Sequence, residues 1–194
     1  MARSKDTRAR ILAAATTEFA ARGIAGARVD RIAADSGASK PMLYTYFGSK
    51  DKLFDAVFTA HVVANSDRVP FTADDLPGYA VGLYNDYLAD PALLRLIAWK
   101  RLEISGNEYL YGAFAANDAA HHDAIAARQR RGELRSDIAP DDIWSLVISA
   151  ASTWAQVSIT QVATALDAEG EHDRRRAALT AFVRDGLIIP ERRE

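Results

Sequence analysis

The stretch that decides the fold is residues 29–50, VDRIAADSGASKPMLYTYFGSK. Its first half places Val29, Ile32 and Ala33 at the spacing of one helical face. Gly37 then favours a helix end, because glycine enters the left-handed region without a Cβ penalty. The stretch therefore begins with a short amphipathic helix that ends in a tight turn.

A second short helix follows this turn. Ser39 is a good N-cap, and Pro41 suits the first helical turn, where a missing N–H costs little. Leu43 and Phe47 are four residues apart and are expected to point inward. The side chains expected on the outside are Lys40, Met42, Tyr44, Thr45 and Tyr46. Two short helices joined by a tight turn, the second with basic, hydroxyl and aromatic groups outside, predict a helix-turn-helix.

These residues closely resemble the DNA-binding half of the TetR (tetracycline-repressor) family of bacterial transcriptional regulators. The matching positions are residues 8–12, Phe19, Gly23, Val29, Ile32, Ala33, residues 37–40, Leu43, Tyr44, Tyr46, Phe47, Lys50, Leu53 and Phe54. The rest of the chain matches in length, helicity and a few local phrases. The resemblance implies an all-α fold of about nine helices. Residues 1–53 would form a three-helix DNA-binding domain, and residues 54–194 a helical ligand-binding and dimerisation domain.

The resemblance also implies roles for the residues of the second helix. The positions expected to hold the phosphate backbone are Ser39, Lys40, Tyr44, Tyr46 and Lys50. Such contacts position a protein on DNA without reading sequence. Pro41, Met42 and Thr45 would lie nearest the base edges, where Thr45 can hydrogen-bond a base and pack on a thymine methyl. An alternative for Tyr44 and Tyr46 is partly buried packing within the domain.

Three positions depart from the family's pattern. Arg28 stands at a helix start where most relatives carry Thr or Ser, so it cannot cap through a hydroxyl. Its charged side chain can still contact a phosphate. Pro41 stands where many relatives have Gly, and Tyr46 where many have His.

Composition and charge agree with a DNA-binding head. The chain has 194 residues, 49% of them hydrophobic, and no Cys, so disulfides and thiolate metal sites are excluded. The net charge of −2 hides an asymmetry: residues 1–53 carry +5 and residues 54–194 carry −7. A basic head on an acidic body suits binding of a polyanion at one end, although a chance excess on a solvated face is an alternative. With no apolar leader or spanning run, we expect a soluble cytoplasmic protein without a membrane partner.

The helices flanking the helix-turn-helix are expected to support it. The first should run from residue 4 or 5 to about residue 22, with Gly23 as its C-cap. After Gly48, Ser49 starts a helix over residues 50–65. This helix has two apolar stripes, one through Leu53 and Val57 and the other through Phe54 and Phe58. It would therefore pack on both the head and the body and act as a lever between them.

Helical spacing continues through the body. A connection over residues 66–76 precedes helices around residues 80–88, over 91–105, and from 107 or 108 to about 131. Residues 140–166 are predicted to form one helix that is apolar nearly all round and carries a band of small residues, so it should be buried against a second copy. A last helix is expected over residues 171–185. The predicted homodimer interface is Ile148, Ser152, Gln156, Ile159, Leu179, Phe182 and Val183. A two-fold dimer implies a palindromic operator in double-stranded DNA.

A ligand site is expected mainly from the resemblance, because body aromatics are more often core than pocket. The family's apolar cavity among the middle helices would be lined by Trp99, Glu103, Tyr109, Phe114 and Trp144 and would bind an unknown small-molecule effector. Asp118 and His122 are four apart and could share a metal, but a structural or solvated role is favoured. We therefore expect no metal and no cofactor.

The leading hypothesis is thus a DNA-binding regulator, most simply a repressor released from its operator by a ligand, and not an enzyme. One alternative keeps the DNA binding but is constitutive or controlled by a partner protein. Another is an all-helical enzyme or lipid-handling protein, although the sequence shows no nucleophile elbow, Gly-rich phosphate loop or HExxH motif.

Overall fold

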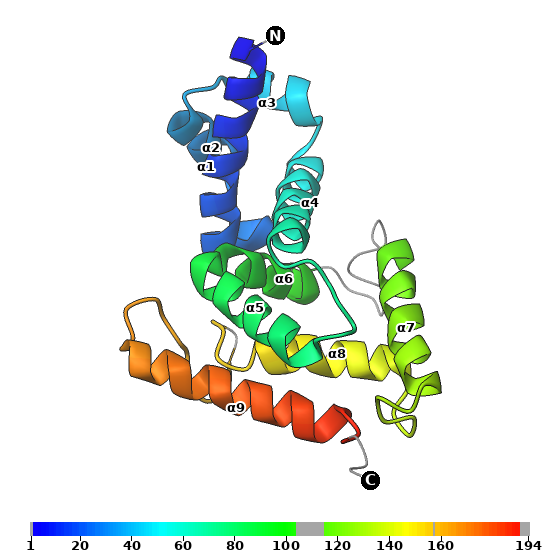
Figure 1. Cartoon of the computed structure of the whole chain (residues 1–194). Coiled ribbons are helices and arrows are strands. Elements are labelled where there is room, and N and C mark those ends of the chain that lie inside the picture. Colours follow the sequence, from blue (N-terminus) through cyan, green and yellow to red (C-terminus); the bar gives the residue numbers. More distant parts are fainter. Residues whose placement is uncertain (1, 104–114, 157, 191–194) are drawn as a thin grey trace. The chain divides into compact units, whose positions relative to one another are not determined.

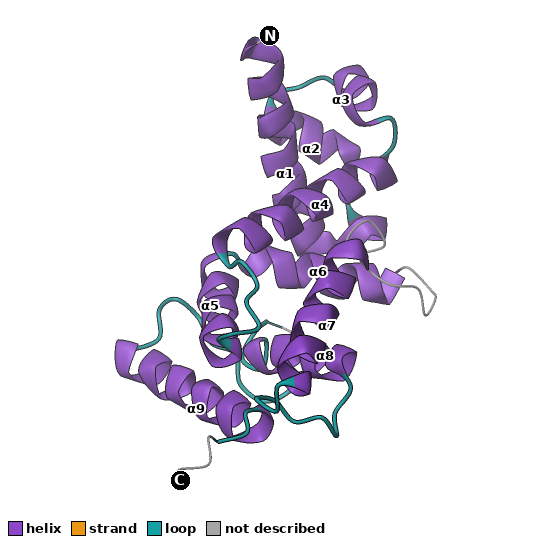
Figure 2. Cartoon of the chain, turned by 45° about the vertical axis from the view of Figure 1, so that its right-hand side comes forward, coloured by secondary structure: helices purple, strands orange, loops and turns teal. Residues whose placement is uncertain are grey.

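The computed structural model describes residues 2–103, 115–156 and 158–190. Over these residues the chain forms nine α-helices and no β-strand, with one isolated antiparallel bridge between Leu134 and Ile188 (Figure 2). The all-α prediction is therefore confirmed. None of the described helices is long and apolar enough to cross a membrane. The chain divides into two compact units, with the divisions after Ala64 and after Asp90.

The first unit contains the N-terminal helices and one helix from later in the chain. Its elements are α1 (Ala2–Gly26), α2 (Val29–Ser36), α3 (Lys40–Phe47), α4 (Lys50–Arg68) as far as Ala64, and α6 (Pro91–Glu103). In both views α1 and α4 lie alongside each other (Figures 1 and 2). The edge of the Phe19 ring meets the Phe54 ring at 5.2 Å between centroids, and both side chains are buried. Residues of α1 and α4 thus form the core on which α2 and α3 are built.

The second unit contains the end of α4 from Asn65 together with α5 (Leu76–Ala89), α7 (Ala115–Arg130), α8 (Pro140–Ala151) and α9 (Glu169–Leu187). Helix α5 packs against both α8 and α9. The Tyr84 hydroxyl and His172 Nδ1 share a buried hydrogen bond of 2.7 Å that joins α5 to α9. The buried Arg175 donates to Asp167 at 2.6 Å and ties α9 to the segment before it.

Most predicted helix ends lie within a few residues of the observed ones, and the differences have local causes. Helix α1 continues past Gly23 to Gly26, with a kink at Gly23, whose φ of 72° is left-handed. Helix α4 continues to Arg68, which pairs with Asp86 on α5. Helix α9 includes Gly186 instead of ending there.

The prediction of one helix over residues 140–166 is wrong beyond Ala151, where α8 ends. The hydroxyls of Ser152 and Thr153 donate to the carbonyl of Ser149 at 3.0 and 3.4 Å, and such local bonds compete with helix continuation. The chain then turns so that the Trp154 ring meets Tyr84 edge-on at 5.8 Å. The helix end was not predicted because apolar residues with helical spacing continue beyond Ala151.

The compact units also differ from the predicted division after residue 53, because α6 packs on α1 in the first unit. The assignment of residues 54–194 to ligand binding and dimerisation stays a prediction.

Candidate nucleic-acid interface

The helix-turn-helix is held by the caps that its sequence predicts. Gly37 has a φ of 64° and ends α2, with its N–H directed to the last carbonyls of that helix. The Ser39 hydroxyl accepts from the Met42 N–H at 3.4 Å and begins α3. Ile32, Leu43 and Phe47 are buried, as expected. These contacts fix two short helices at a tight turn without help from the exposed face of α3.

That face carries most of the predicted DNA-binding residues. The exposed side chains are Ser39, Lys40, Pro41, Met42, Tyr44 and Thr45. Met42 and Tyr44 are 41% and 47% exposed, so neither side chain belongs to the core of the unit. Tyr46 is half-buried, with its ring 6.2 Å from that of Phe47. The packing alternative therefore describes Tyr46 better than Tyr44.

Two polar groups on this face already have partners in the free protein. Lys40 Nζ lies 2.6 Å from Asp30 Oδ1, and this bond raises the pKa of Lys40, so the ammonium stays charged. The Thr45 hydroxyl donates to the Pro41 carbonyl at 2.9 Å, which leaves its oxygen free to accept a bond from a base. A phosphate would have to compete with Asp30 for Lys40.

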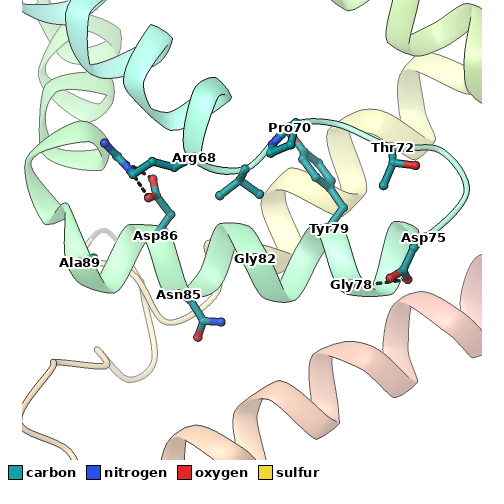
Figure 3. Close-up of a pocket in the computed structure, with 11 residues that line it drawn as sticks. Arg68, Pro70, Thr72, Asp75, Gly78, Tyr79, Gly82, Asn85, Asp86 and Ala89 are labelled. Atoms are coloured by element: carbon teal, nitrogen blue, oxygen red, sulfur yellow. Dashed lines mark hydrogen bonds and ion pairs between the residues drawn. The ribbon is translucent and has the colours of Figure 1, made fainter.

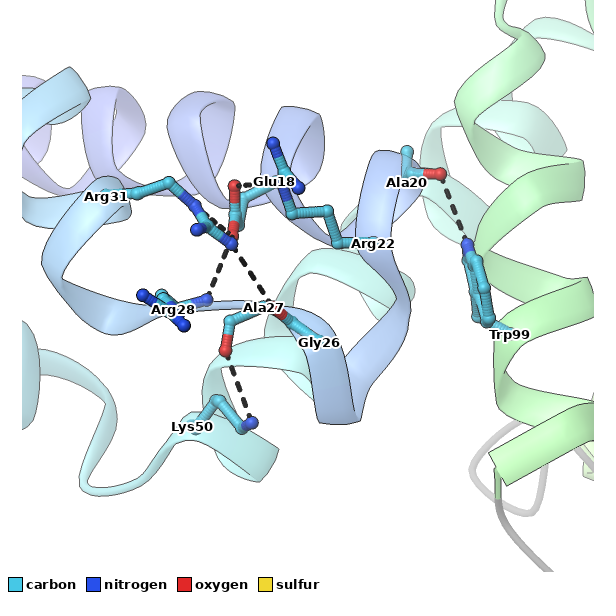
Figure 4. Close-up of polar contacts among 9 residues, drawn as sticks. All are labelled: Glu18, Ala20, Arg22, Gly26, Ala27, Arg28, Arg31, Lys50 and Trp99. Atoms are coloured by element: carbon cyan, nitrogen blue, oxygen red, sulfur yellow. Dashed lines mark hydrogen bonds and ion pairs between the residues drawn. The ribbon is translucent and has the colours of Figure 1, made fainter.

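Lys50 has a structural role that its sequence position does not reveal. Its half-buried ammonium donates to the carbonyls of Ala25 and Ala27 at 3.3 and 3.4 Å (Figure 4). In the free protein this predicted phosphate contact therefore joins the start of α4 to the chain between α1 and α2. This role could not be predicted from the sequence, because Lys50 and the two carbonyls that it contacts are more than 20 positions apart.

The start of α2 is held by a carboxylate in place of a hydroxyl cap. Arg28 makes no side-chain cap, as expected, and its own side chain is exposed. Its backbone N–H donates instead to Glu18 Oε1 at 2.9 Å. Glu18 is buried and also accepts from Arg31 Nε at 2.8 Å (Figure 4). The bond with Arg31 is the main cause that holds the pKa of Glu18 below its usual value. Sequence analysis missed both Glu18 and Arg31.

Helix α6 binds the end of α1 through backbone groups. The Glu103 carboxylate accepts from the N–H groups of Ile24 and Ala25 at 3.1 and 2.6 Å. Trp99 Nε1 donates to the Ala20 carbonyl at 3.2 Å (Figure 4). A Cβ at Gly23 would lie only 2.7 Å from the Trp99 ring. Trp99 and Glu103, predicted to line a ligand cavity, thus hold the end of α1 in the described structure.

The other predicted ligand residues do not join them in a described site. Trp144 is buried in the second unit, where it stacks on Tyr79 at 5.8 Å. Tyr109 and Phe114 lie outside the described residues. Among the residues that the structure describes, no group of three or more His, Cys, Asp or Glu side chains is arranged to hold a metal ion.

The predicted dimer residues separate into three groups. Leu179 and Val183 are buried within the second unit, while Phe182 on the same helix is 66% exposed. Ile148 is half-buried on α8. Ser152, Gln156 and Ile159 follow α8, so the single helix predicted to carry them is wrong beyond Ala151, while their place in a dimer interface stays a prediction. Leu146, which was not among the predicted dimer residues, is 48% exposed and lies with Phe182, Trp154 and Ala178 around a hollow of about 500 Å³.

Comparisons with known proteins agree over both parts of the chain. Residues 11–57 match the family model for bacterial regulatory proteins of the tetR family, and residues 75–184 match the model for the tetracyclin repressor-like C-terminal domain. The transcriptional repressor SCO4008 of Streptomyces coelicolor is 38% identical over 152 residues, which cover 78% of this chain and 79% of that protein. The transcriptional activator FasR of Mycolicibacterium smegmatis is 32% identical over 108 residues, which cover 44% of this chain and 49% of that protein.

A solved structure gives the same result for the fold. SCO4942 of Streptomyces coelicolor, described as a transcriptional regulator, superimposes with a TM-score of 0.78 at 36% identity and covers 95% of this chain and 99% of its own. A capped helix-turn-helix with an exposed second helix, followed by a helical body, defines a DNA-binding transcriptional regulator. The chain belongs to the TetR family of bacterial regulators.

Proposed function

We propose that the protein is a homodimeric repressor that binds a palindromic operator and leaves it when a small-molecule effector binds. The observation that carries the proposal is the exposed face of α3, which presents Lys40, Tyr44 and Thr45 on a helix fixed by its own caps. Ammonium and hydroxyl groups suit phosphates, and Thr45 and Met42 suit base edges. Binding to chromosomal operators would place the protein in the cytoplasm.

Repression is favoured over activation by the relatives. The repressor SCO4008 is similar over more than three quarters of the chain, whereas the similarity to the activator FasR covers less than half. The direction of regulation depends on where the operator lies, so a reporter gene under the neighbouring promoter tests it directly. Deletion of the regulator should raise expression from that promoter, and a fall would instead indicate activation.

Dimerisation is supported by apolar surface on α8 and α9. Leu146 and Phe182 are large apolar side chains that are about half or more exposed, and they border the hollow of about 500 Å³. A second, smaller hollow of about 170 Å³ lies beside Leu146, Phe182 and Gly186. A monomer rarely leaves such neighbouring apolar groups in water. A second copy applied by a two-fold axis would cover them and place two α3 helices for two half-sites.

DNA binding is tested by footprinting on the DNA beside the protein's own gene. We expect protection of two inverted half-sites whose centres are one helical turn or a multiple apart. Lys40→Ala and Thr45→Ala should each weaken protection, while Arg174→Ala on the exposed side of α9 serves as a matched control and should not. Equal protection of unrelated DNA, or no effect of either α3 variant, would contradict the proposal.

Effector release is tested separately. Compounds that raise the melting temperature of the free protein are added to the protein–operator complex, and the fraction of bound DNA is measured by fluorescence anisotropy. Release is expected for at least one such compound. A regulator that keeps its operator in the presence of every compound it binds would be constitutive or controlled by a partner protein.

A further inference from the structure

A cluster of polar groups in the second unit lies beside three packed aromatic rings, which we call the aromatic box. Helix α7 contributes Asp118, His121 and His122, and the box consists of Phe71, Tyr79 and Trp144. The Phe71 ring lies 5.0 Å from Trp144 and 5.2 Å from Tyr79, edge-on to both. The His121 ring lies 4.2 Å from Phe71 and 4.5 Å from Trp144. The imidazole therefore sits against the faces and edges of aromatic rings.

Two nitrogens of this cluster have no hydrogen-bond partner among the described residues. They are His121 Nδ1 and His122 Nε2, and both atoms are shielded from water. His121 Nδ1 lies 3.8 Å from Asp118 Oδ1, which is too far for a hydrogen bond. Buried polar groups in folded proteins normally have partners, so two such nitrogens on one helix point to a partner that is not part of the described chain.

The charges around Asp118 are unbalanced. Burial raises the pKa of Asp118, and only His121 and His122 oppose this shift. Burial also lowers the pKa of His121 and raises that of Tyr79, whose one electrostatic neighbour is Asp118. Among the described residues no Lys or Arg acts on any of these three groups. A buried acid without a cationic neighbour is unusual, since buried charges in proteins are generally paired.

Each of the groups present suits a positively charged partner. A carboxylate and the unprotonated nitrogen of an imidazole accept hydrogen bonds, and aromatic faces attract cations. A metal ion fits less well, because two adjacent histidines on a helix point about 100° apart. An anion would meet the Asp118 carboxylate with no described cation to offset it. The chemistry of the cluster thus selects for an apolar molecule that carries positive charge.

Access to the cluster remains open. The side chains of Asp118 and His121 are 14% and 25% exposed. Tyr79 also lines an open groove of about 530 Å³ between α5 and residues 68–72 (Figure 3). Its ring extends from α5 toward Pro70. Asp118 and His121 are thus partly accessible to solvent, and Tyr79 is the member of the box that borders this groove.

We infer that Asp118, His121 and His122, with the box of Phe71, Tyr79 and Trp144, form a binding site for an aromatic organic cation. The inference rests on the proposed effector response, for which it names the chemical class of the effector. Asp118 pairs with the charge, the histidine nitrogens accept any N–H group, and the rings stack on the apolar part.

Charge selectivity is tested with three probes that share one ring system. N-methylacridinium is permanently cationic, acridine is uncharged at mildly alkaline pH, and acridine-9-carboxylate is anionic. Isothermal titration of the full-length protein should give an affinity for the cation at least tenfold higher than for acridine, and weaker binding still for the anion. Equal or reversed preference among the three, or binding of none of them, would overturn the inference.

Asp118→Asn tests the residue and not only the charge of the probe. This near-isosteric change should lower the affinity for N-methylacridinium at least tenfold and leave that for acridine within about twofold. Asp123→Asn, an exposed acid on the same helix, is the matched control and should change neither. A melting curve of each variant checks folding. Unchanged binding of the cation by Asp118→Asn would exclude this site.

Operator release separates the inference from the proposed function. If N-methylacridinium binds through Asp118 but leaves DNA affinity unchanged, the site stands and effector release fails. If only acridine or its carboxylate releases the operator, the proposed release by an effector is supported, and the inference that the effector is a cation is contradicted.

Discussion

At the scale of single residues, Glu18 provides the hydrogen-bond acceptor at the start of α2 that the side chain of Arg28 cannot provide. Its carboxylate accepts the Arg28 N–H and two bonds from the Arg31 guanidinium. Because Glu18 is buried, its loss would leave the Arg28 N–H without its acceptor, while Arg31 would keep its bond to the Gly26 carbonyl. The entry into the helix-turn-helix thus depends on a residue that lies on α1.

Glu18→Gln should lower the free energy of unfolding by about 1–3 kcal/mol at neutral pH. The pKa of Glu18 in the folded protein lies below the ordinary value of 4.5, so its contribution is complete above about pH 4.5 and is lost as the pH falls through the folded pKa. Urea unfolding at several pH values should therefore show a variant that differs least from the wild type in acid. Glu171→Gln, an exposed carboxylate paired with Arg174, should have little effect at any pH.

Lys40 and Lys50 are predicted to contact phosphates, but they start from different surroundings. Lys40→Ala should reduce the slope of log affinity against log salt by about one while leaving stability unchanged, because its partner Asp30 is exposed. Lys50→Ala should reduce the slope similarly and also lower the melting temperature, because the carbonyls of Ala25 and Ala27 lose their donor. A fall in stability without a change of slope would assign Lys50 a bracing role alone.

Local chemistry explains what could be predicted at this scale. Gly37, Ser39 and Ser49 act within four residues of their own positions, so their cap roles follow from the sequence. Glu18 and Glu103 act on backbone groups 10 and 79 residues away, measured to Arg28 and Ile24. A carboxylate on a helix has no local pattern that shows which distant N–H it will accept.

At the scale of elements, the joint between α1 and α6 depends on the absence of a side chain at Gly23. Its φ of 72° favours glycine, and an added Cβ would meet Trp99 and Glu103. We expect Gly23→Ala to destabilise the protein by about 1–3 kcal/mol and to weaken operator binding, because α1 carries the residues that hold α2. Gly170→Ala, where a Cβ has open space, is the control. Thermal unfolding measures the loss of stability, and fluorescence anisotropy with labelled operator measures the loss of DNA affinity. Both losses are expected in Gly23→Ala.

The exposed face of α8 and α9 gives the second prediction at this scale. Leu146→Asp and Phe182→Asp should convert the dimer to a monomer in sedimentation experiments, since each places a charge in the proposed apolar contact. Both side chains are exposed in the single chain, so its fold should survive, as judged by helicity. Leu102→Asp changes an exposed apolar residue of the first unit and should leave the assembly intact. Dimers that persist in both α8 and α9 variants would move the interface elsewhere.

The two helices also show why their buried and exposed faces were only partly predicted. The apolar residues of 140–166 do have helical spacing. Such spacing shows which face of a helix would be apolar, but it does not show whether the helix continues. The side-chain hydroxyls after Ala151 end it, and Trp154 finds a partner on α5 that the sequence does not indicate. Leu179 and Val183 were correctly placed on an apolar face, but that face belongs to the core of the unit.

At the scale of the whole molecule, α4 is the element that contributes to both compact units. Its residues before Asn65 belong to the first unit, and its last turn belongs to the second, where Asn65 and Arg68 both bind Asp86. The residues of both apolar stripes, such as Leu53 and Phe54, all lie before Asn65 in the first unit, so this division does not bear out the prediction that one stripe packs on the body. That α4 passes a change from one unit to the other stays a prediction. An effector that favours one arrangement of the body would thereby bias the spacing of the two α3 helices.

Reciprocity gives a test of this coupling. An effector that prefers the DNA-incompetent form by about 100-fold would supply roughly 2.7 kcal/mol per site, enough to empty a marginally occupied operator. Operator DNA must then weaken effector binding by the same factor. Titrating an effector with and without saturating operator measures that factor. Equal affinities in the two titrations would mean that the units are uncoupled.

The hydrogen bonds to the backbone of Ala25 determine which substitutions position 25 can accept during evolution. Glu103 binds the N–H of Ala25 and Lys50 binds its carbonyl, so α6 and α4 both recognise groups that every residue except proline possesses. The side chain of Ala25 itself is exposed and makes neither contact. Most amino acids at position 25 should therefore preserve the contacts of α1 with α6 and α4. Substitutions at positions 23, 50 and 103 should not. A saturation library at position 25 should tolerate nearly everything but proline.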